Sequence, residues 1–268
     1  MKIGFIGLGN MATAMIGGML EKGLVEPEDI IGSARTVETV ERVKGKYKIT
    51  AIIDNMRVAK EADVLFLAVK PVFFQEIIAE IKDVVRGETI VVSIAAGRDL
   101  TYLREAFGRA SLKLIRCMPN TPALVLEGCT GVCPGQWVTE EDMDKVMKLL
   151  NSFGRAYLVP ERLMDVVVGI SGSSPAYVFM FIEAMADAAV AGGMSRQQAY
   201  EFAAQAVLGS AKMVLETGLH PGQLKDMVCS PGGTTIQAVR VLEEKGFRAA
   251  VMDAAEACME KSREMSKR

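Results

Sequence analysis

The chain has 268 residues, a length that allows one large domain or two smaller ones and a sizeable hydrophobic core. Half of the residues are hydrophobic and 24% are charged, so the chain should fold rather than stay disordered. The formal net charge of −2 gives no electrostatic reason to expect nucleic acid or an anionic membrane as a partner. A small molecule is therefore the expected ligand.

Targeting and metal-binding signals are not recognisable in the sequence. The N-terminus enters an apolar run at Ile3. It lacks the longer apolar segment and the small-residue cleavage site that a secretion signal would have. The uncharged run 166–182 contains the polar segment Ser171–Pro175, which argues against a membrane span. Five cysteines without a CxxC pair, and the single histidine His220, give no metal-ligand spacing. We expect a cytoplasmic protein with reduced thiols and no metal.

Residues 1–160 alternate β-branched runs with helical stretches, at the spacing of βαβ units. The expected strands are Ile3–Ile6, Ile30–Ser33, Ile49–Ile53, Val64–Val69, Thr89–Ile94 and Leu112–Cys117, with two further runs around Thr130–Cys133 and Arg155–Val159. The expected helices are Met11–Lys22, Val37–Lys44, Phe73–Val84 and Leu100–Phe107. This order predicts an α/β fold with a Rossmann-type, mostly parallel sheet.

Residues 161–268 are predicted to form an all-α dimerisation and substrate-binding domain. The expected helices are Leu163–Ile170, Ala176–Ala191, Ser195–Gly218, a short one from Pro221, Thr234–Lys245 and Arg248–Met265. The first two are apolar nearly all round, and such helices must be buried on every face. A helical domain of about a hundred residues cannot easily surround them. We therefore expect an intertwined homodimer.

A dinucleotide fingerprint follows the first strand. It has the pattern G-x-G-x-x-G/A and consists of Gly7, Leu8, Gly9, Asn10, Met11 and Ala12. Gly7 would make the tight turn, and Gly9 would let backbone N–H groups approach a pyrophosphate at the helix N-terminus. The second strand then ends at Ser33, with Arg35 two residues on, where NAD-preferring folds usually carry an acid. A hydroxyl and a guanidinium suit a 2′-phosphate, which favours NADPH, with NADH as the second candidate.

Two later strand ends should also face the cofactor, because ligands sit beyond the carboxyl ends of parallel strands. These ends carry Ala68, Val69, Lys70 and Pro71 after one strand, and Ala95 and Ala96 after the next. Lys70 is interpreted as a loop lysine that steadies the nucleotide or the loop rather than as a catalytic acid.

A Gly-rich helix start marks the second half of the chain. Ser230-Pro231-Gly232-Gly233-Thr234-Thr235 opens a helix, so the first N–H groups lack partners within it and can hold a carboxylate. A simple cap would need only one such residue. We expect substrate binding here, with the N–H groups of Gly233, Thr234 and Thr235 as donors.

The chain resembles the Δ1-pyrroline-5-carboxylate reductases, which make L-proline with NAD(P)H. The resemblance lies in Gly4–Ala12, Ala68–Pro71, Arg116–Pro122, Ser171–Tyr177 and above all His220–Ile236. It implies that Ser33, Arg35 and Asn55 contact the adenosine end, and that Val69, Lys70 and Ala96 line the cofactor. It also implies that Glu161, Ser230, Gly233, Thr234 and Thr235 bind substrate, with Thr235 near the ring nitrogen as the catalytic hydroxyl. The self-association it implies is a dimer, or a decamer as the larger form.

The residue inventory agrees with reduction of an imine. Alcohol or ketone redox normally needs a positioned acid or base, and this chain has no lysine between Lys148 and Lys212. A cyclic imine can enter protonated, so hydride transfer needs orientation more than an acid. The alternative enzyme is a β-hydroxyacid dehydrogenase, because Gly4–Met11 also resembles the opening of that family. That family carries a lysine on its interdomain helix, where this chain has Ser171–Pro175. A nucleotide-sensing module is the third hypothesis and leaves the Gly-rich helix start unexplained.

Overall fold

The structure, a computed structural model, describes residues 1–266 and divides by contacts into two units. Met1–Ser173, together with the chain from Cys258 onward, forms the unit that we call the sheet unit. Ser174–Ala257 forms the helical unit. By contacts within one chain, residues 161–173 belong to the sheet unit. The expected boundary at residue 160, between a nucleotide-binding and a substrate-binding domain, stays a prediction.

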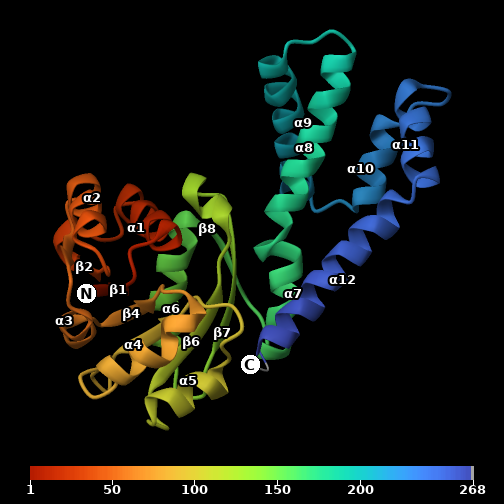
Figure 1. Ribbon diagram of the computed structural model, residues 1–268. Coiled ribbons are helices and arrows are strands. Elements are labelled where there is room, and N and C mark those ends of the chain that lie inside the picture. Colours follow the sequence, from red (N-terminus) through yellow and green to blue (C-terminus); the bar gives the residue numbers. More distant parts are fainter. Residues whose placement is uncertain (267–268) are drawn as a thin grey trace. The chain divides into compact units, whose positions relative to one another are not determined.

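The sheet unit is built on eight strands in the order β3-β2-β1-β4-β5-β6-β7-β8. All neighbouring strands are parallel except β6 and β7, which confirms the expected Rossmann-type sheet (Figure 1). Ile6 at the end of β1 pairs with Ser33 of β2 and with Leu67 of β4. Three strands therefore end level, and the loops that follow them leave from one edge. The strands are β1 Ile3–Ile6, β2 Ile30–Ser33, β3 Thr50–Ile52, β4 Val64–Leu67, β5 Ile90–Ser93, β6 Lys113–Met118, β7 Gly128–Pro134 and β8 Gly154–Leu158.

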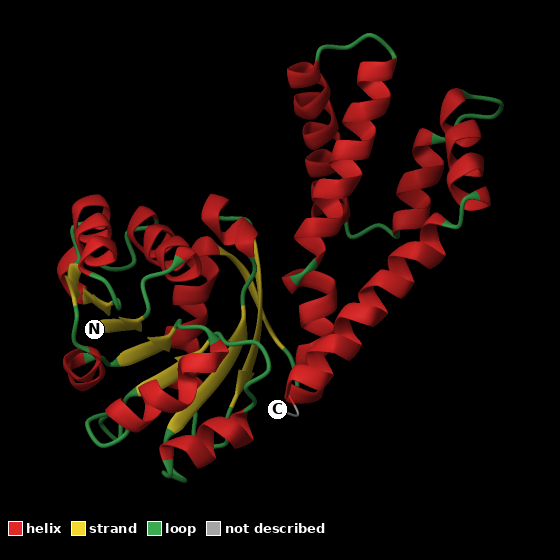
Figure 2. Ribbon diagram, in the orientation of Figure 1, coloured by secondary structure: helices red, strands yellow, loops and turns green. Residues whose placement is uncertain are grey.

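Helices cover both faces of the sheet (Figure 2). The helices are α1 Asn10–Glu21, α2 Val37–Tyr47, α3 Asn55–Glu61, α4 Phe74–Ile81, α5 Leu100–Phe107 and α6 Glu140–Leu150. Side chains of α1, α2 and α6 pack in one core with Phe5 and Phe66, and those of α3, α4 and α5 pack in the other with Leu65 and Leu67. Neither α3 nor α6 was expected from the sequence. Burial on both faces explains why the central strands β1, β4 and β5 are runs of buried, mostly apolar residues.

The segment Ser171–Pro175 differs from its expected form as a break between two helices. Helix α7, Met164–Val167, continues through a π-helical turn at Val168–Gly172. The N–H of Ser173 donates to the carbonyl of Val168 at 2.8 Å, and the Ser171 hydroxyl donates to the carbonyl of Val167 at 3.0 Å. Pro175 offers no N–H to the Ser171 carbonyl, which instead accepts from Asn120 Nδ2 at 2.9 Å, and the chain continues through the wider turn into α8.

The helical unit contains α8 Ser174–Ala191, α9 Arg196–Thr217, α10 Pro221–Val228, α11 Thr234–Glu244 and the first part of α12, Phe247–Ser266. The expected helix ends are confirmed at three places. The Ser195 hydroxyl accepts from the N–H of Gln198, Gly218 ends α9 at a φ of 66°, and His220 Nδ1 accepts from the N–H of Gly222. His220 is thus the capping residue of α10.

The helical unit leaves large apolar side chains uncovered within one chain. In α8, Ala186 is the buried residue, while Phe179 and Met180 are 63% and 68% exposed. By length and composition, 161–191 is also long and apolar enough to cross a membrane, and its most apolar window is 6% buried. A surface of this kind requires something to cover it.

Candidate functional site

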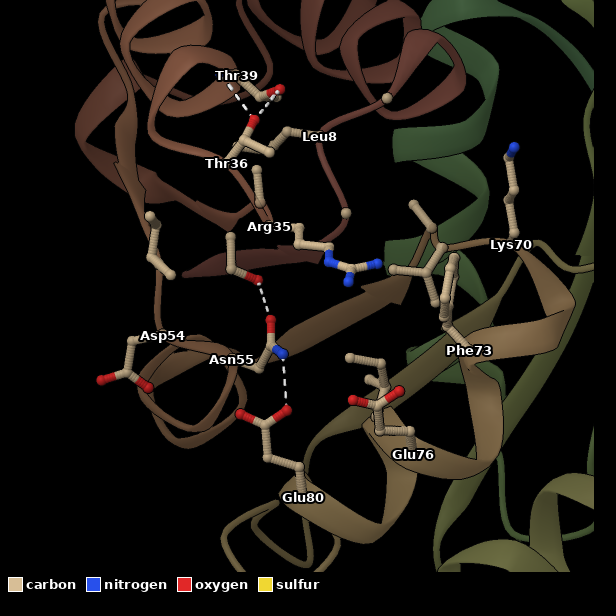
Figure 3. A pocket seen from close by; sticks show the side chains of 18 of the residues that line it. Leu8, Arg35, Thr36, Thr39, Asp54, Asn55, Lys70, Phe73, Glu76 and Glu80 are labelled. Carbon is tan, nitrogen blue, oxygen red and sulfur yellow. Dashed lines mark hydrogen bonds between the residues drawn. The ribbon is translucent and has the colours of Figure 1, made fainter.

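A cavity of about 560 Å³ opens at the carboxyl edge of β1, β2 and β4, within the sheet unit (Figure 3). Nine of the fifteen residues predicted to bind cofactor line it: Gly7, Leu8, Gly9, Ser33, Arg35, Asn55, Ala68, Val69 and Lys70. They come from three strand ends and from the start of α3. The level register of the strands explains why positions so far apart in sequence share one cavity.

Gly7 and Gly9 serve the cavity for different physical reasons. Gly7 has a φ of 97°, and a Cβ there would lie 2.6 Å from the carbonyl oxygen of Ala68. Gly9 has the ordinary extended angles φ −78° and ψ −172°, and a Cβ there would meet nothing within 4 Å. The first residue allows the turn to exist, and the second keeps space open in front of α1. The cavity therefore has the bare backbone that a pyrophosphate requires.

Arg35 occupies the centre of the cavity in Figure 3. Its guanidinium carbon lies 5.8 Å from the centroid of the Phe73 ring, a cation–π contact that holds the cation over the pocket. Arg42 of α2 also lines the cavity. Two cations and the hydroxyls of Thr36 and Thr39 together fit the 2′-phosphate of NADPH.

Six of the predicted cofactor residues lie outside the lining: Asn10, Met11, Ala12, Pro71, Ala95 and Ala96. The first three form the opening turn of α1, and Pro71 begins a short 3₁₀ turn before α4. Ala95 follows β5 and is buried, and the loop continues to Gly97 beside the backbone of Met265. Their contacts with a cofactor stay predictions.

Ten lining residues were missed by the sequence reasoning: Ala34, Thr36, Thr39, Arg42, Ile53, Asp54, Phe73, Glu76, Ile77 and Glu80. Thr36, Thr39 and Arg42 recur at a spacing of three on the helix after β2, and that pattern was a usable signal. Glu76 and Glu80 lie on α4, and only the packing of α4 beside α3 brings them to the pocket.

The helical unit contains the second expected site, at the start of α11. Gly233 is the N-cap, no side chain caps the helix, and the first turn holds no acid. A Cβ on Gly233 would lie 2.4 Å from the Ser230 hydroxyl oxygen, so the glycine makes room for that serine. The N–H of Gly233 donates to the carbonyl of Ser230 at 3.0 Å, because the turn closes on itself. This N–H thus already has a partner within the chain, whereas the first-turn N–H groups of Thr234 and Thr235 have none within the helix. Substrate binding by Gly233 stays a prediction.

Within residues 1–266, α1 and α11 differ from the capped helices in beginning at a glycine N-cap. Helices α4 and α7 also lack a capping side chain, but each follows directly on a 3₁₀ turn. Six other helices have a capping side chain, supplied by Thr36, Asp54, Asp99, Thr139, Ser195 and His220. Helices α1 and α11 instead begin at glycine with no capping side chain. Their first N–H groups and the positive ends of their dipoles are therefore available to an anion.

Glu161 lies in the sheet unit, where its carboxylate has partners of its own. Its Oε1 accepts from the N–H of Leu100 at 2.7 Å and lies 3.5 Å from a guanidinium nitrogen of Arg116. Arg116 is buried, and its Nε and second terminal nitrogen have no hydrogen-bond partner. In one chain Glu161 thus balances a buried cation, and substrate binding by Glu161 stays a prediction.

Two of the five cysteines, Cys117 and Cys133, are buried, and the other three are half-buried. Burial raises the pKa of the Cys117 thiol far above its ordinary value, with a smaller contribution from Cys133. All five cysteines are free thiols. Within residues 1–266, no three His, Cys, Asp or Glu side chains gather as metal ligands would.

Comparison with known proteins matches two parts of the chain to family models. Residues 161–265 match the family model described as pyrroline-5-carboxylate reductase dimerisation, and residues 2–97 match NADP oxidoreductase coenzyme F420-dependent. The chain is 56% identical over 266 residues to the pyrroline-5-carboxylate reductase of Escherichia coli K12, covering 99% of this chain and 98% of that protein.

Solved structures give the same result. A pyrroline-5-carboxylate reductase from Coxiella burnetii superposes with a TM-score of 0.93 at 33% identity, covering 100% of this chain and 99% of that one. The Plasmodium falciparum pyrroline carboxylate reductase, crystallised with NADP bound, superposes with a TM-score of 0.89 at 33% identity. The match to the Plasmodium structure covers 99% of this chain and 98% of that one.

Proposed function

The chain belongs to the pyrroline-5-carboxylate reductase family, and from that premise we propose that it reduces Δ1-pyrroline-5-carboxylate to L-proline with NADPH. It is an NAD(P)H-dependent oxidoreductase of that family. The structural observation that carries the proposal is the pair of helix starts, at Gly9 and Gly233, that lack a capping side chain. Each suits an anion, and this reaction brings together a dinucleotide and a small carboxylic acid.

The cavity at the sheet edge fits a dinucleotide phosphate. Gly9 leaves bare backbone at the start of α1, and Arg35 and Arg42 supply positive charge beyond β2. When bound there, NADPH supplies the hydride, which passes to the carbon of the C=N bond. Lys70 lines the cavity at its rim, and we assign it the steadying role expected from the sequence.

The helix start at α11 is the proposed carboxylate site. The N–H groups of Thr234 and Thr235 and the Ser230 hydroxyl would hold the acid, and the Thr235 hydroxyl would meet the ring nitrogen. A protonated cyclic imine already has an electrophilic carbon, so the nitrogen keeps its proton when the hydride arrives. The product amine then requires a hydrogen-bond partner rather than a strong acid.

A β-hydroxyacid dehydrogenase is the weaker reading, and the family relationship overturns it. The segment where that family carries its lysine is here the π-helical turn and the start of α8, from Val168 to Pro175. No residue in it can serve as an ammonium acid.

The dimerisation region supports self-association, and we propose an intertwined homodimer that covers the exposed apolar side chains of α8 and α9. A second copy offers equally apolar faces, which makes it a better cover than water. A decamer of such dimers is the larger assembly we propose. The free thiols and the net charge of −2 support a cytoplasmic protein with no nucleic-acid or membrane partner.

The test of this function is NADPH oxidation with pyrroline-5-carboxylate by the starting protein and by Thr235→Val, which removes the hydroxyl and keeps the shape. We expect kcat/KM to fall about tenfold or more, the effect of losing one hydrogen bond to the reacting centre. Thr217→Val, the same change at the end of α9, is the control and should leave the rate unchanged. Turnover of 3-hydroxyisobutyrate and none of the imine would overturn the proposal.

A further inference from the structure

Three polar side chains that line the cavity form a hydrogen-bonded row, of which Figure 3 labels Asn55 and Glu80. The Ser33 hydroxyl donates to Asn55 Oδ1 at 2.7 Å, and Asn55 Nδ2 donates to Glu80 Oε2 at 2.8 Å. They come from β2, α3 and α4 respectively. Ser33 is only 1% exposed, so its hydroxyl has few other partners to choose from. Glu80 has no part in the function proposed so far.

The direction of each hydrogen bond in this row follows from Glu80. An ionised carboxylate only accepts hydrogen bonds, so Asn55 must turn its NH₂ group toward Glu80. The carbonyl oxygen of Asn55 then faces Ser33 and also only accepts. The single proton of the Ser33 hydroxyl is therefore committed to Asn55. What Ser33 can offer a ligand is a lone pair, which differs from the expectation that its hydroxyl suits a 2′-phosphate.

A lone pair on Ser33 distinguishes the two dinucleotides chemically. The ribose 2′-hydroxyl of NADH can donate to it, whereas the 2′-phosphate of NADPH requires donors. Arg35 and Arg42, which also line the cavity, can supply such donors. For Ser33 to donate as well, Asn55 would have to turn its carbonyl toward Glu80, and two acceptors would then face each other.

We propose that Glu80 is a specificity-determining positioning residue: through Asn55 it presents Ser33 as an acceptor to a ribose 2′-hydroxyl, so that the chain binds NADH as well as NADPH. The assignment rests on the proposed function, because it requires a dinucleotide in this cavity. It places part of the selection between NADH and NADPH on α4. Rossmann-type folds usually make this selection with an acid at the end of the second strand.

Glu80→Gln tests the assignment, because glutamine can donate or accept and lets the whole row reverse. The affinities of NADPH and NADH are measured by calorimetric titration without substrate. The ratio Kd(NADH)/Kd(NADPH) should rise about fivefold, the equivalent of one hydrogen bond. Glu76→Gln removes the same charge from the same cavity but has no bond to Asn55, and should change the ratio by less than about twofold. Equal shifts in both variants would show a charge effect and overturn the assignment.

Ser33→Ala is then introduced into the starting protein and into Glu80→Gln. The comparison gives a result that a change in charge alone would not produce. In the starting protein, loss of the hydroxyl should weaken NADH more than NADPH, because an acceptor for the 2′-hydroxyl is lost. In the Glu80→Gln background, it should weaken NADPH more, because Ser33 can then donate to the phosphate. The same preference in both backgrounds would overturn the assignment while leaving the proposed function intact. Failure of the starting protein to bind either dinucleotide would overturn both.

Discussion

Gly9→Ala separates the binding role of the fingerprint from its role in folding. Gly9 has extended angles that alanine adopts freely, and its new methyl group would meet no atom of the protein within 4 Å. The methyl would instead project into the space in front of α1, where the pyrophosphate should approach the backbone. The substitution should therefore change the stability of the fold little and weaken the binding of the dinucleotide.

The two expected magnitudes differ widely. Alanine is a somewhat poorer N-cap than glycine, so the free energy of unfolding should fall by about 1 kcal/mol or less. A hydrogen bond from a backbone N–H to a charged phosphate contributes about 1.5–3 kcal/mol, and a methyl in between would remove at least one. The Kd for NADPH should therefore rise about 10- to 100-fold.

Urea unfolding and calorimetric titration with NADPH measure the two quantities on the same samples. Gly45→Ala, in α2 and with equally open surroundings, is the control and should leave the Kd unchanged. Gly7→Ala should behave in the opposite way to Gly9→Ala, because a φ of 97° and a Cβ 2.6 Å from the Ala68 oxygen strain the backbone. It should lose about 1–3 kcal/mol of stability or more. An unchanged Kd for Gly9→Ala would refute the reasoning.

Three other changes test separate features. Arg35→Glu should weaken NADPH by about tenfold or more and NADH far less, and equal losses in titrations would contradict a phosphate contact. Met180→Glu places a charge on the exposed apolar surface of α8 and should yield monomers in sedimentation at micromolar concentration, whereas an intact dimer would exclude this surface from the interface. Asp142→Asn should cost about 1 kcal/mol at neutral pH. Burial alone would raise the pKa of Asp142, but hydrogen bonds from Lys113 and Thr139 hold it below the ordinary value. The stabilisation is therefore present above the ordinary pKa and lost as pH falls through the lower one, so urea curves of the two proteins should converge in acid.

Local patterns in the sequence singled out nine of the residues that line the cavity at the sheet edge. The fingerprint from Gly7 to Ala12 needs only a strand, a turn and a helix, and all three are decided by neighbouring residues. Ser33 and Arg35 were found in the same way, from the end of one strand. Helix α3 was missed because its seven residues are too few for a clear periodicity, although Asp54 caps it as a sequence signal would.

The segment Ser171–Pro175 shows where local reasoning gives the wrong structure. Serine, glycine and proline favour a break, yet the chain continues through a π-helical turn. Asn120 contributes to that outcome, because its amide NH₂ donates to the carbonyl of Ser171 at 2.9 Å while its oxygen accepts from Cys129. A partner 51 residues away supplied what the local sequence lacked.

The sequence by itself determined the fold class, the two helix starts at glycine and the presence of a cation, Arg35, after the second strand. Each of these depends on residues adjacent in the chain. The tertiary structure decided which atoms donate and which accept in the cavity. Glu80, Asn55 and Ser33 lie on three elements that meet only when the sheet assembles, and hydrogen-bond direction passes from one to the next. Such direction is a property of contact in space, so no pattern along the chain could contain it.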